Sequence, residues 1–130
     1  MSDAALKKKA AQIKLLVLDV DGTLTDGGVY IDANGVQSKK FHIRDGMGIT
    51  LLHEKGLPVG ILSHSRSKTI LDERARMLGI ERVYSGKEPK LEVLTRWLLE
   101  LNLTYEQVAY IGDDVNDLEV LEKVGFSACP

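Results

Sequence analysis

The chain has 130 residues, of which 44% are hydrophobic and 28% are charged, and its formal net charge at pH 7 is −2. These values are typical of one globular domain with a hydrophobic core; they lack the basic excess of nucleic-acid-binding proteins, and no apolar run could span a membrane. The only cysteine is Cys129, which excludes an internal disulfide, and the N-terminus has lysines but no apolar signal segment, so we expect a protein of the reducing cytoplasm.

The first predicted elements are a short helix over 4–12 and a strand over 14–18. Apart from its first residue the strand is continuously apolar, as in strands that are covered on both faces in a parallel sheet. It ends abruptly at Asp19, after which acids and glycines follow. Since chemistry in open α/β sheets sits just beyond the carboxyl ends of the strands, this position is a candidate functional site.

The segment 27–41 predicts a β-hairpin. Val29 and Ile31 alternate with a tyrosine, and Asn34-Gly35 is a strong turn signal. The segment is long enough for a hairpin and too short for a separate cap domain.

Helices and strands alternate over the rest of the chain. Caps and glycines bound the helical segments, and short apolar runs mark the strands. This alternation predicts an α/β fold: a three-layer, Rossmann-like parallel sheet with a hairpin flap after the first strand and no cap domain, all in a single domain over 1–130. Helices are predicted over 47–55, 68–78, 89–101 and 116–124, with Ser67 as the cap of the second. A single capped turn is predicted over 104–107, and strands are predicted over 57–63, 82–84, 108–111 and 126–128.

Polar side chains lie at the ends of several predicted strands. Asp19 and Asp21 follow the first strand, Ser63 ends the second, and Asp113 follows the fourth. Lys90 lies near the start of the helix after the third strand. Because the carboxyl ends of parallel strands share one edge of a sheet, we expect these side chains to converge there. Asp and Gly are also common in turns, but a turn alone does not explain the apolar strand that leads into them.

The run Asp19-Val20-Asp21-Gly22-Thr23-Leu24-Thr25-Asp26-Gly27 resembles the first motif of the haloacid dehalogenase superfamily of phosphotransferases. It resembles more closely the small cap-less bacterial phosphatases that act on 3-deoxy-D-manno-octulosonate 8-phosphate (KDO 8-phosphate), and the resemblance extends from about Ile13 to the last residue. It implies a phosphoric monoester hydrolase of lipopolysaccharide biosynthesis that requires Mg²⁺, forms tetramers, and hydrolyses KDO 8-phosphate or a related 2-keto-3-deoxy sugar acid phosphate.

The resemblance also implies roles for individual residues. Asp19 would attack phosphorus and form an aspartyl phosphate, and Asp21 would act as general acid and then base. Ser63 and Lys90 would bind the phosphate. The Mg²⁺ ligands would be Asp19, Asp113 and the backbone carbonyl of Asp21. Such a site needs cations, since two unit charges 4 Å apart interact at about 4 kcal/mol with an effective dielectric near 20, and carboxylates select a hard metal ion such as Mg²⁺.

Further polar residues surround these positions. Asp114 is expected to orient Lys90 or a metal-bound water. Asn116 and Asp117 are expected either to support the metal site or to cap the following helix. Lys87 is a rival to Lys90 for the phosphate.

The second motif departs from the resembled family. Relatives have threonine or serine, then glycine and arginine, whereas this chain has the run Ser63-His64-Ser65-Arg66. His64 stands where glycine is usual, and Arg66 lies one place late. Either a longer loop lets Arg66 bind substrate in the usual way, or the substrate differs. Arg44 is a second candidate for substrate binding, with a contact to a neighbouring chain or a surface salt bridge as alternatives.

The hairpin sequence also bears on assembly. The hairpin presents more apolar surface than an isolated ribbon should expose, through Val29, Ile31, Val36 and Phe41. Without a cap, a neighbouring chain would have to cover the site. We therefore expect a homo-oligomer, with a tetramer implied by the resembled family.

Other interpretations stay open at this point. A receiver domain also has an acidic sheet edge, a lysine and Mg²⁺, but its acceptor aspartate lies on a middle strand, where this sequence has Ser63 and Tyr84. A noncatalytic domain with the same fold and a phosphatase of another small phosphorylated metabolite are further alternatives.

The resembled relatives continue past 126–130 with more strand and helix, so this chain is expected to be a C-terminally shortened version.

Overall fold

The computed structural model describes residues 2–130. Its elements alternate along the chain as the sequence predicts. In chain order they are α1 (Asp3–Ala11), β1 (Leu15–Leu18), β2 (Tyr30–Ile31), β3 (Gln37–Ser38), α2 (Ile43–Glu54), β4 (Val59–Ser63), α3 (Lys68–Leu78), β5 (Arg82–Ser85), α4 (Lys90–Leu101), the 3-10 turn η1 (Tyr105–Gln107), β6 (Val108–Ile111), the 3-10 turn η2 (Val115–Asp117), α5 (Leu118–Lys123) and β7 (Phe126–Ala128).

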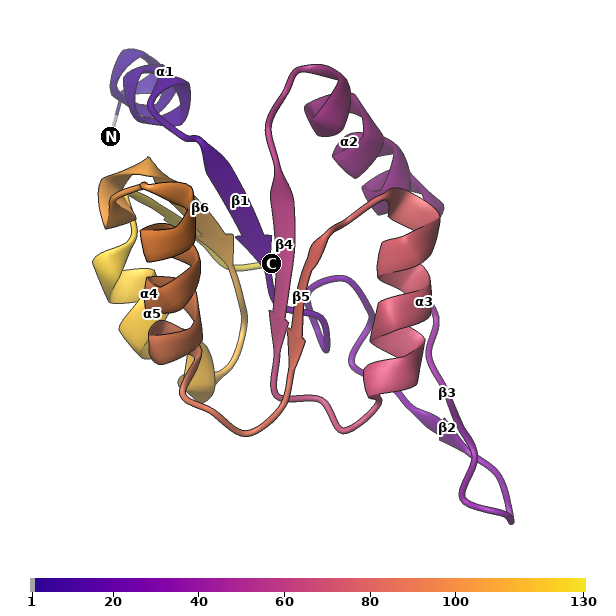
Figure 1. The fold of residues 1–130 in the computed structure, drawn as a ribbon. Coiled ribbons are helices and arrows are strands. Elements are labelled where there is room, and N and C mark those ends of the chain that lie inside the picture. The colour runs from indigo at the N-terminus through magenta and orange to yellow at the C-terminus, as the bar shows by residue number, and fades with distance from the viewer. Residues whose placement is uncertain (1) are drawn as a thin grey trace.

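Five strands form one parallel sheet in the order β5-β4-β1-β6-β7. Figure 1 shows α4 and α5 on one face of the sheet and α2 and α3 on the other. The predicted three-layer α/β fold is therefore confirmed. The segments that could hold a cap contain only the β2–β3 hairpin, and α3 with β5. None of the helices within residues 2–130 is both long enough and apolar enough to cross a bilayer.

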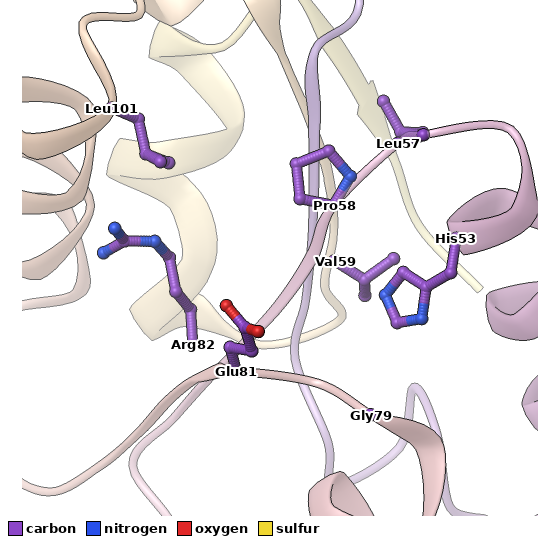
Figure 2. Close-up of a pocket in the computed structure, with 9 residues that line it drawn as sticks. His53, Leu57, Pro58, Val59, Gly79, Glu81, Arg82 and Leu101 are labelled. Atoms are coloured by element: carbon purple, nitrogen blue, oxygen red, sulfur yellow. The ribbon is translucent and has the colours of Figure 1, made fainter.

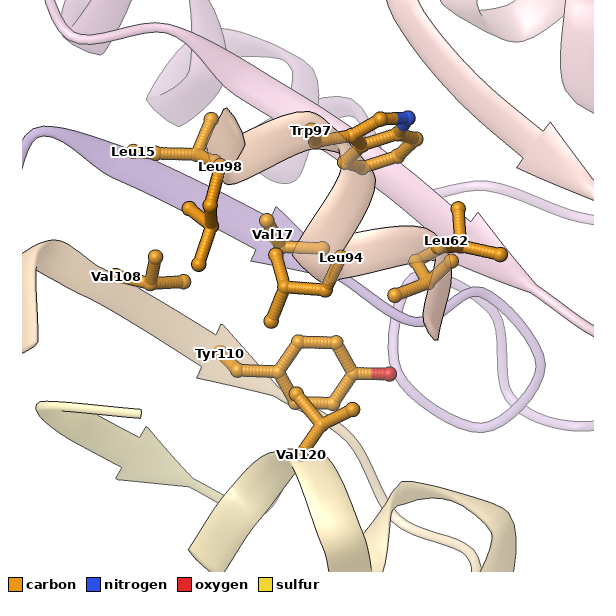
Figure 3. Close-up of a cluster of buried hydrophobic side chains, with 10 residues drawn as sticks. Leu15, Val17, Leu62, Leu94, Trp97, Leu98, Val108, Tyr110 and Val120 are labelled. Atoms are coloured by element: carbon orange, nitrogen blue, oxygen red, sulfur yellow. The ribbon is translucent and has the colours of Figure 1, made fainter. Parts of the chain in front are cut away.

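The central strand β1 is buried because both of its faces are covered. Leu15 and Val17 point into the cluster under α4 and α5, which also contains Tyr110 (Figure 3). Leu16 and Leu18 pack into the second cluster, under α2 and α3. Burying a leucine contributes about 1.5–3 kcal/mol relative to leaving it exposed, so the continuous apolar run fixes β1 at the centre of the sheet.

The hairpin formed by β2 and β3 projects from the body of the protein beside α3 (Figure 1). Phe41 differs from its expected exposure: its ring packs against the second cluster and lies 5.2 Å below the guanidinium of Arg74. The other apolar side chains of the hairpin are exposed, with fractions of 42% for Val29, 70% for Tyr30, 65% for Ile31 and 63% for Val36.

Two helices begin at other residues than predicted because their caps differ, and one predicted helix is divided in two. Helix α2 begins four residues early, since His42 caps it by accepting a hydrogen bond from the N–H of Arg44 at 3.0 Å. Pro89 is the cap of α4 rather than its first residue. The helix predicted over 116–124 is split into η2 and α5. Ser67 precedes α3 without capping it through its side chain.

Candidate active site

The carboxyl ends of β1, β4 and β6 meet at one edge of the sheet. Asp19 directly follows β1, its side chain is buried, and its N–H donates to the carbonyl of Ile111 at 2.9 Å. Asp113 lies two residues beyond Ile111, at the end of β6, and Ser63 is the last residue of β4. The structure thus brings the predicted aspartates and serine to the same edge.

Lys90, the first residue of α4, is the centre of a buried polar cluster. Its Nζ donates to Oδ1 of Asp19 at 2.9 Å, to Oδ1 of Asp117 at 2.6 Å and to the Tyr110 hydroxyl at 3.3 Å. The Lys90 side chain is 1% exposed, so these contacts replace water around its charge. Figure 3 shows the Tyr110 ring inside the core with its hydroxyl directed away from the ring's apolar neighbours, toward the strand ends. Lys90, and not Lys87, therefore contacts the predicted nucleophile.

Asp117 organises the loop that carries Asp113. Its Oδ1 accepts hydrogen bonds from Lys90 and from the Tyr110 hydroxyl, and its Oδ2 accepts from the backbone N–H groups of Asp113 and Asp114 at 3.1 Å each. Burial works to raise the pKa of Asp117, but the hydrogen bonds from Lys90 and Tyr110 outweigh it and hold this pKa below its ordinary value. Asp117 is thus an ionised acceptor that fixes the shape of the loop.

Asp114 does not make the Lys90 contact expected of it, because Asp117 occupies that position. Its exposed carboxylate accepts a hydrogen bond from the N–H of Val115 at 2.6 Å and caps the η2 turn. The other expected role of Asp114, toward a metal-bound water, stays a prediction.

A divalent cation fits between the acidic side chains. Asp19, Asp113 and Asp117 each offer one carboxylate oxygen, and these oxygens lie within 4.8 Å of one another. Because both oxygens of Asp117 already accept hydrogen bonds, Asp19 and Asp113 are the better ligands. The loop after β1 approaches them closely: a Cβ on Gly22, which has φ of +83°, would lie 1.9 Å from Oδ2 of Asp113. An all-oxygen donor set of this kind suits Mg²⁺.

The electrostatics of Asp19 also favour a bound cation. Burial raises the pKa of Asp19 to about 6, although the hydrogen bond and charge of Lys90 oppose this rise and the charge of Asp117 adds to it. Burial and the hydrogen bond to Asp117 raise the pKa of Tyr110 as well, so its hydroxyl remains a neutral donor. Additional positive charge beside Asp19 would favour the carboxylate form that a nucleophile requires.

Lys39 is a site residue that the sequence analysis missed. It follows β3, and its Nζ donates to Oδ1 of Asp21 at 2.6 Å and to the hydroxyl of Ser65 at 2.9 Å. Its side chain is 3% exposed, whereas that of Lys40 is 72% exposed. The sequence holds no local signal for this difference, because the two lysines are adjacent in the arm of a hairpin.

The loop after β4 borders an open hollow of about 510 Å³. The buried hydroxyl of Ser63 accepts a hydrogen bond from the N–H of Ser65 at 2.9 Å, which shapes the start of this loop. The hollow has a basic lining: His64, Ser65, Arg66, Lys68, Ser85, Gly86 and Lys87. Arg44 lines a different, mostly apolar hollow between α2 and the end of the chain, so the structure does not bring it together with Arg66.

His64, the residue that departs from the family motif, bridges two loops of the site. Its Nε2 lies 2.7 Å from the carbonyl oxygen of Glu88, and its Nδ1 lies 3.2 Å from the side-chain amide nitrogen of Asn116. A neutral ring protonated on Nε2 satisfies both contacts, by donating to the carbonyl and accepting from the amide. His64 therefore ties the loop before Lys90 to the loop that carries the acids.

A further hollow lies at the opposite end of the sheet. It has a volume of about 450 Å³ and sits where β4 and β5 begin, with Val59, Glu81 and Arg82 among its lining residues (Figure 2). None of the clustered acids line it, so it is separate from the candidate active site.

Comparison with known proteins relates this geometry to enzymes. The family model for haloacid dehalogenase-like hydrolases matches residues 43–125. The 3-deoxy-D-manno-octulosonate 8-phosphate phosphatase KdsC of Escherichia coli is 41% identical over 124 residues, which are 95% of this chain and 65% of that protein. The chain thus spans slightly less than two thirds of the length of this relative.

Two solved structures share the fold. The 3-deoxy-D-manno-octulosonate 8-phosphate phosphatase of Yersinia pestis superposes with a TM-score of 0.90 at 42% identity, over 94% of this chain and 65% of that one. The enzyme of the same name from Moraxella catarrhalis, in complex with a magnesium ion, a phosphate ion and KDO, superposes with a TM-score of 0.91 at 34% identity, over 97% of this chain and 73% of that one.

Proposed function

Because the chain belongs to the haloacid dehalogenase-like hydrolase family, we propose that it is a Mg²⁺-dependent phosphatase acting on KDO 8-phosphate or a related 2-keto-3-deoxy sugar acid phosphate. The observation that carries this proposal is the buried carboxylate of Asp19, held by Lys90 at the end of β1 beside Asp113. The names of the relatives support the substrate. Membership of a hydrolase family favours this function over a receiver domain.

The first chemical step is an in-line attack on phosphorus. A carboxylate oxygen of Asp19 forms the new P–O bond, and the bond from phosphorus to the sugar oxygen breaks. Asp21 gives its proton to the departing alkoxide. Lys90 fixes the orientation of the Asp19 carboxylate through its hydrogen bond to Oδ1. Mg²⁺ bound by Asp19 and Asp113 would supply positive charge against the negative phosphoryl group.

The second step restores the enzyme. Asp21, now a carboxylate, takes a proton from water as the water oxygen attacks the phosphorus of the aspartyl phosphate. The bond to Asp19 breaks and inorganic phosphate leaves. The hydroxyl of Ser63 and backbone N–H groups of the loop after Asp19 would hold the phosphoryl oxygens through both steps. Positioning and electrostatics account for most of the catalysis in such a mechanism.

The basic hollow beside Ser65 suits the rest of an anionic sugar acid. Arg66 and Lys87 line it and are exposed. A guanidinium can bind a carboxylate with two parallel hydrogen bonds. We assign Arg66 to the carboxylate of the substrate, and Arg44, which lines another hollow, a lesser part in substrate binding.

We also propose that the active form is a homotetramer. The exposed apolar residues of the hairpin support this, and so does a stripe along α2. Ile43, Met47 and Leu51 are spaced four residues apart and are 86%, 58% and 53% exposed. A helical stripe of this kind is suited to burial against another chain. We further propose that residues 1–130 form a single hydrolase domain. We place this domain in the cytoplasm, because a chain with one cysteine forms no internal disulfide and needs no oxidising compartment.

Turnover of a substrate panel tests the function. The purified chain would be assayed for phosphate release from KDO 8-phosphate, related sugar acid phosphates and hexose phosphates that lack a carboxylate. We expect the highest kcat/KM with a sugar acid phosphate, and loss of turnover after chelation that Mg²⁺ restores. Preference for hexose phosphates would contradict the substrate class, and full turnover without a divalent ion would contradict the metal requirement.

A further inference from the structure

Lys39 is a buried lysine that the hairpin delivers to the proposed acid and base of the reaction. Removing an ammonium group from water is costly unless it is paired and hydrogen-bonded. The adjacent Lys40 stays in water, so burial of Lys39 is not a general property of this arm. The compensating partners of Lys39 are the carboxylate of Asp21 and the hydroxyl of Ser65.

The two aspartates of the first motif are held in the same way. Lys90 donates to Oδ1 of Asp19, and Lys39 donates to Oδ1 of Asp21. Within residues 2–130, no other side chain donates a hydrogen bond to the Asp21 carboxylate. With Oδ1 fixed by Lys39, Oδ2 is the oxygen left for proton exchange with the leaving group and with water.

The hairpin is attached to the loop after β4 at a second point. The hydroxyl of Ser67 donates to the side-chain carbonyl oxygen of Gln37 at 2.8 Å, and the N–H of Ser67 donates to the hydroxyl of Ser65 at 3.1 Å. Ser65 therefore accepts from both Lys39 and the loop backbone. These bonds connect the position of Lys39 to the segment that departs from the family motif.

We infer that Lys39 is a positioning residue for the proposed phosphatase reaction: it fixes the Asp21 carboxylate so that one oxygen faces the leaving group. This inference rests on the proposed function. Lys39 acts through Asp21, so its loss matters most when the departing group must be protonated. A sugar alkoxide needs a proton, whereas p-nitrophenolate departs without one.

The test is the single-turnover rate of leaving-group release for two substrates. Lys39→Met removes the ammonium and keeps much of the side-chain length. Lys40→Met is the matched control, because it changes the net charge equally at an exposed neighbour. For Lys39→Met we expect a loss of about tenfold or more with KDO 8-phosphate, toward the about 100-fold that a positioned general acid contributes. With p-nitrophenyl phosphate we expect a loss below about twofold by the same reasoning.

The conservative variant Lys39→Arg keeps the cation, and we expect it to restore most of the rate with KDO 8-phosphate. A merely structural role would lower the rates of both substrates equally, and that result in Lys39→Met would overturn the inference. A rate with KDO 8-phosphate in Lys39→Arg no higher than in Lys39→Met would overturn it too. A wild-type rate in Lys39→Met would overturn it as well. If the wild type and Lys40→Met hydrolyse no phosphate ester, the proposed function itself fails and the inference falls with it.

Discussion

At the scale of single residues, the candidate site depends on one buried cation between two carboxylates. The Lys90 side chain is 1% exposed, and those of Asp19 and Asp117 are 7% and 0% exposed. Buried side chains lose their hydration, so their charged forms are stabilised only by one another and by hydrogen bonds such as that from Tyr110. The same contacts orient Asp19, the proposed nucleophile, so stability and the proposed activity depend on the same residues.

Substitution of Lys90 should therefore affect both properties. In Lys90→Met the two carboxylates lose their common partner, and breaking a buried ion pair typically costs about 3–5 kcal/mol. We expect the free energy of unfolding to fall by a comparable amount in urea titrations at neutral pH, and turnover to be lost. Lys87→Met, in the exposed loop before α4, is the control and should change stability by less than about 0.5 kcal/mol. Equal stability of the two variants would show that Lys90 does not balance these charges.

At the scale of elements, loops from three strand ends must hold their relative positions. His64 connects the loop after β4 to the segment before α4 and to the η2 turn. The loop after β1 is positioned by close packing, because Gly22 lies against the carboxylate of Asp113 with φ of +83°. Only glycine adopts this backbone conformation readily while leaving room for the neighbouring acid.

Gly22→Ala should accordingly disturb the metal site. Its added Cβ would fall 1.9 Å from Oδ2 of Asp113, so the carboxylate must move. We expect Mg²⁺ affinity, measured by calorimetric titration, to fall by about tenfold or more, in line with the 10–100-fold typical when the support of a ligand is lost. Gly35→Ala is the matched control, since Gly35 has φ of +77° in the hairpin turn and nothing within 4 Å of an added Cβ. Equal Mg²⁺ affinity in both variants would argue against Asp113 as a ligand.

At the scale of the whole molecule, the fold leaves the site without a cap, and it leaves most apolar side chains of the hairpin exposed. The ribbon of β2 and β3 exposes large apolar side chains, and so does the outer stripe of α2. Exposed apolar side chains on both elements are the observation from which the tetramer is proposed. In the proposed tetramer, a second copy of the chain would cover the ribbon.

Charge on the hairpin should separate such an assembly. For Ile31→Asp, whose side chain is 65% exposed in the wild type, we expect dissociation because a carboxylate would have to be buried at the interface. Leu99→Asp is the control, at a 78% exposed position on α4, away from the hairpin in Figure 1. Light scattering should give the tetramer mass for the wild type and Leu99→Asp and a smaller mass for Ile31→Asp. A monomeric wild type would contradict the proposal.

Local patterns in the sequence predicted the sheet and most of the acidic site. The apolar run of β1 and the acids that follow it are contiguous, so their positions follow from one short stretch. Lys39 could not be found in this way, because its partner Asp21 lies 18 positions earlier in the chain and only the folded hairpin joins them. The Tyr110 contact to Lys90 spans 20 positions and likewise depends on how α4 packs on β6.

The prediction that Phe41 is exposed is wrong for a related reason. Phe41 lies in the same hairpin arm as the exposed Val36, but Arg74 and the second core cluster come from distant elements and cover its ring. Roles that depend on such contacts require the tertiary structure.

The proposed mechanism requires that Asp19 form a covalent aspartyl phosphate. The enzyme would be mixed with KDO 8-phosphate and Mg²⁺, quenched in acid during turnover and reduced with borohydride, which converts an acyl phosphate of aspartate to homoserine. Peptide mass mapping should then find homoserine at position 19, and Asp19→Asn, a near-isosteric change, should show neither this product nor turnover. Turnover by Asp19→Asn near the wild-type rate, or homoserine at another aspartate instead, would contradict the mechanism.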